Sequence, residues 1–307
     1  MSDPCISVII AAKNAERTIA LCLDSVSRLD YPYYEVIVVD DGSEDQTGRI
    51  AADHAGVKVF RMNGEGPSVA RNRAVMQAHG DFVAFTDADC VVSQDWIKEL
   101  LKGFVDETVA GVGGIQKSPA DEVPFARKVQ QLLQAFGFMT NYMQTARALR
   151  EVNHNASCNV MYRRSVYDAF CGFLEDFWPG EDLELDHRIR QKKWKLMMNP
   201  KAVVYHYRTQ TVQGFSRMMF RYGWAQGKLV RMHGAFRPVQ WLPLVTFLGL
   251  FGLFFFPVPS LIAMALLATG TLFRLSFDAT KVFLSIVAFI QWHFGFLKGI
   301  ISPSQNE

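Results

Sequence analysis

The sequence "DFVAFTDADC", residues 81–90, joins a short apolar run to two aspartates that are separated by a single alanine. The apolar residues 83–85 are typical of a strand that is buried on both faces of a sheet. Asp87 and Asp89 follow this run directly, where the chain is expected to leave the core. Carboxylates are seldom buried without a partner, so this pair is a candidate functional site.

Residues 1–100 alternate between apolar runs and segments of helical periodicity. This alternation predicts an α/β fold with a mainly parallel sheet and right-handed crossovers. In such sheets ligands bind at the carboxyl ends of the strands. The expected strands cover residues 5–12, 34–43, 57–62 and 81–86, and the expected helices cover residues 13–26, 44–55 and 64–80.

Acidic and amide side chains follow three of these four strands. Asn14 and Glu16 follow the first, Asp40 and Asp41 end the second, and the aspartates at 87 and 89 follow the fourth. A single loop aspartate is more often a helix cap or turn former than a ligand. Acids from three strand ends on one rim of the sheet nevertheless favour a ligand-binding site. These acids would repel a phosphate unless a divalent cation lay between the phosphate and the carboxylates.

Several other classes are disfavoured. The chain has no G-x-x-x-x-G-K-[ST] loop and no G-x-G-x-x-G after its first strand, so neither a P-loop nor a dinucleotide site is expected. The net charge of +2 indicates no particular partner, and we expect no nucleic acid to bind. Five cysteines without metal-ligand spacing and an N-terminus unlike a signal peptide predict a cytoplasmic location for the globular part.

Five stretches, in this order, resemble family 2 glycosyltransferases of the GT-A fold. The sequence departs from the family's usual pattern mainly at Ala11, where the family often has proline. Each motif is short, but the ordered set is specific and spans roughly residues 5–235. The stretches are "ISVIIAAKNAERTIALCLDSV", "EVIVVDDGSEDQT", "GPSVARNRAV", "DFVAFTDADC" and "WPGEDLELDHRI".

The resemblance implies a role for each matching position. Asp182 would be the general base, and Glu181 would orient the base or the acceptor. Asp87 and Asp89 would bind Mn²⁺ or Mg²⁺, with Asp87 alternatively contacting ribose, and His206 would complete the metal site. The residues implied for the nucleotide-sugar donor are Ala12, Asn14, Glu16, Asp40, Asp41, Arg71, Asn72, Asp87 and Ala88.

Some of these positions also have purely structural interpretations. Acids at residues 181 and 182 would be favoured at any helix N-terminus. Trp178 either stacks on a sugar or packs, and Ser157 lines the acceptor side or belongs to an ordinary strand. Arg217 and Arg221 share a helix face, which either approaches the diphosphate or lies against solvent or a membrane surface.

The second half of the chain continues the pattern with longer elements. Residues 121–150 are expected to form one long amphipathic helix, either a core helix or a face that contacts lipid. The stretch "RYGW" does not match the Q-x-x-R-W motif of processive enzymes, which disfavours a long-chain synthase. Further expected elements are helices over 93–105 and 214–237 and strands over 109–118, 154–164 and 199–209.

The C-terminal region is hydrophobic. Residues 241–273 contain no charged residue, and Arg274 follows them directly. Prolines at 257 and 259 interrupt this run, which predicts either one kinked span or a hairpin of two short helices. Each half, of about 16 residues, reaches roughly 24 Å, short of the ~30 Å hydrocarbon core. Residues 281–301 form a third apolar segment that either spans or lies in the interface. Basic residues before the first segment place the catalytic side in the cytoplasm.

These observations predict a GT-A catalytic domain over residues 1–235 and a transmembrane or re-entrant helical region over residues 236–307. The expected enzyme is an inverting, metal-dependent glycosyltransferase at the inner membrane, which moves a sugar from a UDP-type donor to a lipid-linked glycan. The alternatives are a polyprenyl-phosphate monosaccharide synthase, a nucleotidyltransferase, and a non-catalytic membrane-anchored binding protein.

Overall fold

The computed structural model describes residues 3–136 and 148–302. The chain divides into two compact units, and each is described by itself. The first consists of Met1–Asp121 and Met139–Tyr207, and the second of Glu122–Phe138 and Arg208–Glu307. The second unit therefore includes helices that precede residue 236 in the sequence.

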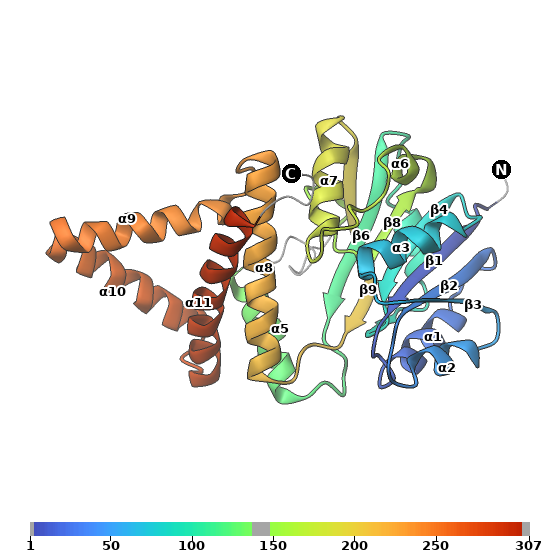
Figure 1. Ribbon diagram of the computed structural model, residues 1–307, viewed down its shortest axis with the longest axis horizontal. Coiled ribbons are helices and arrows are strands. Elements are labelled where there is room, and N and C mark those ends of the chain that lie inside the picture. The colour runs from blue at the N-terminus through green and yellow to red at the C-terminus, as the bar shows by residue number, and fades with distance from the viewer. Residues whose placement is uncertain (1–2, 137–147, 303–307) are drawn as a thin grey trace. The chain divides into compact units, whose positions relative to one another are not determined.

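The first unit is built on one mixed sheet, in the order β3-β2-β1-β4-β8-β6-β9-β5, with β7 beside β9 (Figure 1). Strands β3, β2, β1 and β4 are parallel, as the sequence predicts, and β8 pairs antiparallel with β4. The strands are β1 Ile6–Ala12, β2 Tyr34–Asp41, β3 Val57–Met62, β4 Phe82–Asp87, β5 Cys90–Val92, β6 Val109–Lys117, β7 Arg150–Val152, β8 Asn159–Arg163 and β9 Lys195–His206.

The helices of this unit follow from the strand order. The chain steps outward from β1 to β3 and then returns to β4, so right-handed crossovers place α1 and α2 on one face and α3 on the other (Figure 1). The core strand β1 is almost entirely buried between these layers. The helices are α1 Ile19–Ser27, α2 Thr47–Ala52, α3 Pro67–Met76, α4 Trp96–Leu101, α6 Arg164–Ala169 and α7 Glu181–Gln191.

Most of the predicted helices are shorter than expected, and for two of them the structure shows the reason. The helix expected from residue 13 begins only at Ile19, because the preceding loop instead bonds to the loop after β2. The prediction of one helix over residues 121–150 is wrong at its far end. Helix α5 covers Pro124–Phe136, whereas β7 pairs antiparallel with β9, so sheet pairing overrides local helix propensity there. Residues 137–147 of that prediction lie outside the described residues.

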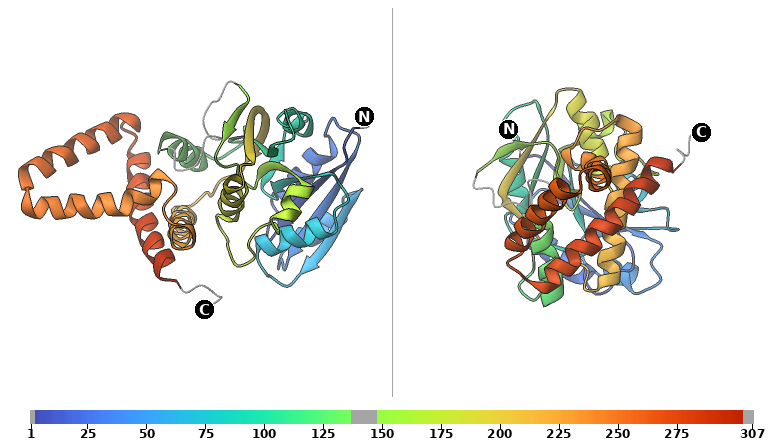
Figure 2. Two further views of the ribbon diagram at one scale, coloured as in Figure 1. Left: turned by 90° about the horizontal axis from the view of Figure 1, so that it is seen from above. Right: turned by 90° about the vertical axis from the view of Figure 1, so that its left-hand side faces the viewer.

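The second unit is helical, and its central feature is the parallel pairing of α8 (Val212–His233) with α11 (Ala279–Ile301) (Figure 2). Gly223 and Gly227 of α8 lie against the backbone of Trp292 and Phe296. An added Cβ at either glycine would overlap a carbonyl oxygen of α11. Gly295 and Gly299 of α11 lie against α8 in the same manner. Each helix thus contributes a G-x-x-x-G pair, the spacing that lets two helix backbones approach closely.

Between these two helices the chain runs out and back as a hairpin. The 3₁₀ turn η2 (Pro238–Trp241) leads into α9 (Leu242–Phe255), and α10 (Pro257–Arg274) returns (Figure 2). Phe256 between them is not helical, so the chain forms two helices and not one kinked helix. Large apolar side chains such as Phe254 and Leu267 are exposed along this hairpin.

Three segments are long and apolar enough to cross a membrane: Pro238–Phe255, Pro257–Arg274 and Ala279–Ile301. At about 1.5 Å per residue, the last of these reaches roughly 34 Å and could span the hydrocarbon core. Exposed apolar helices of this length indicate membrane association, because water would be an unfavourable surrounding for them.

We predict that Gly295→Ala destabilises the protein, because the new methyl group would overlap the Phe220 carbonyl and push α8 away from α11. The expected loss is about 1–3 kcal/mol, seen as a lower Tm in detergent. Gly270→Ala is the matched control, since its Cβ would meet no described heavy atom within 4 Å. Equal Tm values for the two variants would show that the close approach does not stabilise the helix pair.

Candidate active site

Strand register brings His206 close to two aspartates from which it is far apart in the sequence. Asp87 is the last residue of β4, and Asp89 lies in the turn that leads into β5. Antiparallel pairing of β5 with β9 places Cys90 opposite His206, so the histidine lies beside the second aspartate. The distance from His206 Nε2 to Asp89 Oδ1 is 3.3 Å. One ligand atom from each of Asp87, Asp89 and His206 lies within 4.8 Å of the other two.

The donor set of this group fits a divalent cation. The second nitrogen of His206, Nδ1, lies 3.2 Å from Gln116 Oε1. A proton on Nδ1 would be donated to that oxygen, which leaves the Nε2 lone pair for a metal. Two carboxylates and one neutral imidazole suit Mn²⁺ and are compatible with Mg²⁺. The metal assignment of these three residues stays a prediction, and the geometry is compatible with it.

Arg71 joins the aspartate pair to the other acidic motif. Its Nη2 donates to Asp87 Oδ1 at 2.6 Å and its Nη1 donates to Glu181 Oε1 at 2.7 Å. The side chain is 5% exposed and also lies over the ring of Phe173. Burial lowers the pKa of Arg71, but the charges of its two carboxylate partners outweigh burial and raise it above its ordinary value. The predicted contact of Arg71 with the donor phosphates remains untested.

The two acids of the second motif begin helix α7, directly after Gly180, which adopts a left-handed conformation. Asp182 Oδ2 accepts a hydrogen bond from the Ser157 backbone N–H at 2.9 Å, which fixes the carboxylate. Glu181 is buried, and its Oε1 also accepts from Ser157 Oγ. Burial, with the neighbouring charge of Asp182, raises the pKa of Glu181 to about 7, although Arg71 opposes this shift.

A buried network behind the predicted base was not foreseen from the sequence. His154 Nε2 lies 4.0 Å from Asp182 Oδ2, and its Nδ1 lies 2.9 Å from Asp186 Oδ2. Asp186 also accepts from Tyr162 Oη and from the Asn155 backbone N–H. Burial raises the pKa of Asp186. The spacing of Asp182 and Asp186, four residues apart on one helix face, was the only available sign in the sequence.

Asp40 provides a buried acceptor at the end of β2. It is 1% exposed, and its Oδ1 accepts from the Ser43 backbone N–H at 3.0 Å. Its Oδ2 has no hydrogen-bond partner among the described residues, and the nearest cation, Arg61 Nη1, lies 3.8 Å away. Gly48 leaves room for this oxygen, because a Cβ there would overlap it. The oxygen could therefore accept a hydrogen bond from a ligand.

The other residues predicted for the donor lie at the same strand ends, and several bond to neighbouring loops. Asn14 Oδ1 accepts from the Glu44 backbone N–H, and Glu16 Oε2 from that of Gln46, so the loops after β1 and β2 are joined. Asp41 accepts from two backbone N–H groups before α3. Ala12 ends β1, and Ala88 lies between Asp87 and Asp89; both alanines are buried.

Asn72 contributes to packing in the structure, since Nδ2 donates to the Phe173 carbonyl and Oδ1 accepts from Tyr167 Oη. Trp178 is 41% exposed, which leaves both stacking and packing open. Arg217 and Arg221 are exposed on α8 and belong to the second compact unit. The donor or acceptor roles of these four residues stay predictions.

The fold corresponds to that of solved glycosyltransferases. A mannosyltransferase from Pyrobaculum calidifontis, solved with GDP-Man and Mn²⁺, matches with a TM-score of 0.66 and 20% identity. The match covers 99% of this chain and 89% of that one. At this identity the likeness concerns the fold, which is the GT-A fold that the sequence predicts.

The chain belongs to glycosyl transferase family 2, whose pattern matches residues 7–170. It is 30% identical over 205 residues to the beta-monoglucosyldiacylglycerol synthase of Trichormus variabilis, covering 64% of this chain and 43% of the relative. The chain thus spans less than half the length of that relative. It is also 25% identical over 243 residues to a dolichyl N-acetyl-alpha-D-glucosaminyl phosphate 3-beta-D-2,3-diacetamido-2,3-dideoxy-beta-D-glucuronosyltransferase of Methanococcus voltae, covering 74% of each.

We predict that Glu181→Gln flattens the pH dependence of stability. The folded pKa of about 7 exceeds the ordinary value of 4.5, so the folded protein retains this proton longer than the unfolded chain. The resulting stabilisation is complete below pH 4.5 and is lost as the pH rises through 7, by up to about 3 kcal/mol. Tm in detergent should therefore fall more steeply between pH 5 and 7.5 for the parent protein than for the variant.

The exposed Glu65→Gln variant is the control and should keep the parent pH dependence. A Glu181→Gln variant whose Tm changes with pH as the parent's does would contradict the raised pKa.

Proposed function

We propose that the protein is an inverting, metal-dependent glycosyltransferase that uses a nucleotide-diphospho-sugar, for which we expect UDP, and a lipid-linked glycan acceptor. The observation that carries this proposal is the buried Arg71, which holds the Asp87 end of the metal group beside the acidic pair at residues 181 and 182. The catalytic domain would comprise residues 1–235, and residues 236–307 would anchor it to the membrane.

The chain's own residues would have three roles in the reaction: binding the nucleoside, binding the metal and accepting a proton. Asp40, whose buried Oδ2 accepts no hydrogen bond from the residues that the structure describes, would accept one from the nucleoside. Asp87, Asp89 and His206 would hold Mn²⁺ or Mg²⁺, which when bound neutralises charge on the leaving diphosphate. Asp182 would take the proton of the acceptor hydroxyl while that oxygen bonds to the anomeric carbon and the nucleoside diphosphate leaves.

The apolar helices support an acceptor at the membrane. Three candidate spans follow the catalytic residues, and relatives include a protein named as a diacylglycerol glycolipid synthase. The basic residues of the preceding segment, such as Arg231 and Arg237, would face the cytoplasm by the positive-inside rule. We therefore propose the inner membrane as the location, with the catalytic domain on its cytoplasmic side.

A second candidate is transfer of one sugar to a polyprenyl phosphate. The phosphate acceptor is already ionised, so it would need little help from a base. A membrane-anchored binding protein is the remaining non-enzymatic alternative. It is disfavoured because the carboxylates of both acidic motifs are present and are held by specific hydrogen bonds.

We predict that Asp182→Asn lowers sugar transfer by about 10²–10⁴-fold, because the amide cannot accept the acceptor proton. Binding of the nucleoside diphosphate should be nearly unchanged, as read by thermal shift. Glu175→Gln, an exposed acid on the preceding loop, is the control and should transfer normally. Transfer by Asp182→Asn within a few-fold of the parent would reject the base and favour the phosphate acceptor.

We predict that a nucleoside diphosphate raises Tm only in the presence of Mn²⁺ or Mg²⁺, because the acidic rim would otherwise repel the phosphates. A panel of UDP-, GDP- and dTDP-linked sugars, each with and without metal, would identify the donor. Asp89→Asn should lose the metal-dependent part of the shift. No stabilisation by any member of the panel would reject the transferase proposal.

A further inference from the structure

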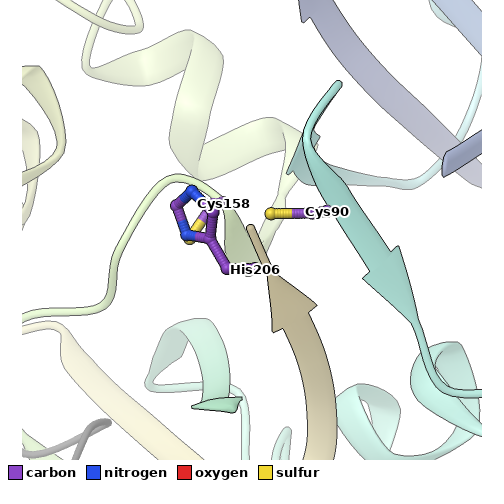
Figure 3. Close-up of side chains that lie close together, drawn as sticks. All are labelled: Cys90, Cys158 and His206. Atoms are coloured by element: carbon purple, nitrogen blue, oxygen red, sulfur yellow. The ribbon is translucent and has the colours of Figure 1, made fainter. Parts of the chain in front are cut away.

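A second group of metal-binding side chains lies beside the aspartates and shares His206 with them. Cys90 begins β5, Cys158 directly precedes β8, and His206 ends β9. Their ligand atoms all lie within 4.8 Å of one another. Figure 3 shows the Cys90 sulfur directed towards the Cys158 side chain and the imidazole. Cys90 and Cys158 are 68 positions apart in the sequence, so their spacing gave no sign of the cluster.

The register of the sheet fixes these three residues. Thr86 pairs with Asn159, so Cys158 lies one residue beyond this pair, towards the end of β4. Cys90 pairs with His206 across β5 and β9. Both cysteines are buried, and the Cys158 thiol makes hydrogen-bond contact with Cys90 and with His206. The cluster therefore lies where the ends of three strands of one sheet meet.

Asp89 lies close to two of these three residues, Cys90 and His206. Its Oδ1 lies 3.8 Å from Cys90 Sγ and 3.3 Å from His206 Nε2. Ligands of a tetrahedral zinc ion, with Zn–S near 2.3 Å and Zn–N near 2.0 Å, lie about 3.3–3.8 Å apart. The Asp89 side chain is 46% exposed, which provides an entry path from solvent.

We propose that Cys90, Cys158 and His206, with Asp89, form a site for a thiophilic divalent cation such as Zn²⁺. Each thiol loses its proton to solvent as the metal binds. The preference for Zn²⁺ over Mn²⁺ or Mg²⁺ follows from the two sulfur ligands and from the higher intrinsic affinity of zinc for nitrogen and sulfur.

Occupation of this site would prevent binding of the donor metal. His206 belongs to both groups, the proposed zinc site would also take Asp89, and each ligand atom can bind only one of the two ions in these positions. Zinc would therefore inhibit sugar transfer by removing two of the three ligands from the hard cation. This consequence rests on the proposed function, whereas the binding of a thiophilic metal does not.

Cobalt replaces zinc as a spectroscopic probe. The purified full-length protein, freed of metal, should bind one Co²⁺ with thiolate-to-cobalt charge-transfer absorption, and Zn²⁺ should abolish this absorption by displacement. Cys90→Ala and Cys158→Ala should lose the charge-transfer band. Cys171→Ala, at an exposed cysteine outside the cluster, is the control and should retain it. A cobalt complex without a thiolate band would reject the site, whether or not the enzyme is active.

The inhibition is tested with Mn²⁺ in excess and increasing Zn²⁺. The parent protein and Cys171→Ala should lose transfer reversibly, with recovery after chelation. Cys90→Ala and Cys158→Ala should keep transfer near the parent level and require at least about 100-fold more Zn²⁺ for inhibition, because the softer ligands are removed. Equal inhibition in all four proteins would reject the competition and place the zinc on ligands other than the cysteines.

A measurement on the parent protein covers the case in which a cysteine variant does not fold. Zn²⁺ should protect Cys90 and Cys158 from alkylation, as read by peptide mass spectrometry, while Cys171 reacts at an unchanged rate. Unchanged alkylation of both cluster cysteines would contradict the proposal. If no donor supports transfer, the cobalt spectrum and the alkylation still decide whether the metal site exists.

Discussion

The guanidinium of Arg71 lies buried between Asp87 and Glu181, and this pair of contacts determines how the acidic site is assembled. Helix α3 thereby connects the end of β4 to the start of α7, although these residues are 16 and 110 positions away in sequence. Removing one partner of a buried ion pair costs roughly 3–5 kcal/mol, because the remaining charge is left without compensation. The arginine therefore acts first on the geometry of the site, by holding Asp87 close to the acidic pair.

The same charge balance explains two properties of the site. Burial and the neighbouring charge of Asp182 raise the pKa of Glu181 to about 7, and the one buried cation, which Glu181 shares with Asp87, opposes this shift only in part. Further negative charge from a diphosphate would be unfavourable beside Asp87 and Asp89 unless a cation compensated it. Asp182 differs from its neighbour, because the Ser157 backbone N–H donates to its carboxylate. Two adjacent acids thus have different surroundings.

Much of the first unit could be predicted because its strands are continuous apolar runs and its acids follow them. The proximity of His206 to Asp89 was expected only from the resemblance, and its physical cause is the register between β5 and β9. The His154–Asp186 contact could not be predicted, since it depends on side-chain directions in a packed interior. The failed helix near residue 150 shows sheet pairing overriding periodicity. By contrast, the sequences "GWAQG" and "GFLKG" carried a usable signal for the α8–α11 contact.

The parallel direction of α8 and α11 also affects how the chain folds during synthesis. Two consecutive helices joined by a short loop run antiparallel, so a parallel partner requires the whole α9–α10 hairpin to be made first. Until α11 has emerged, the glycine face of α8 lacks the backbone against which it packs. Sheet strands made earlier can pair before that point, because domains generally fold as units from the N-terminal side. The helical unit is therefore completed after the sheet. A mutation that disrupts α11 would leave the glycine face of α8 without the helix against which it packs.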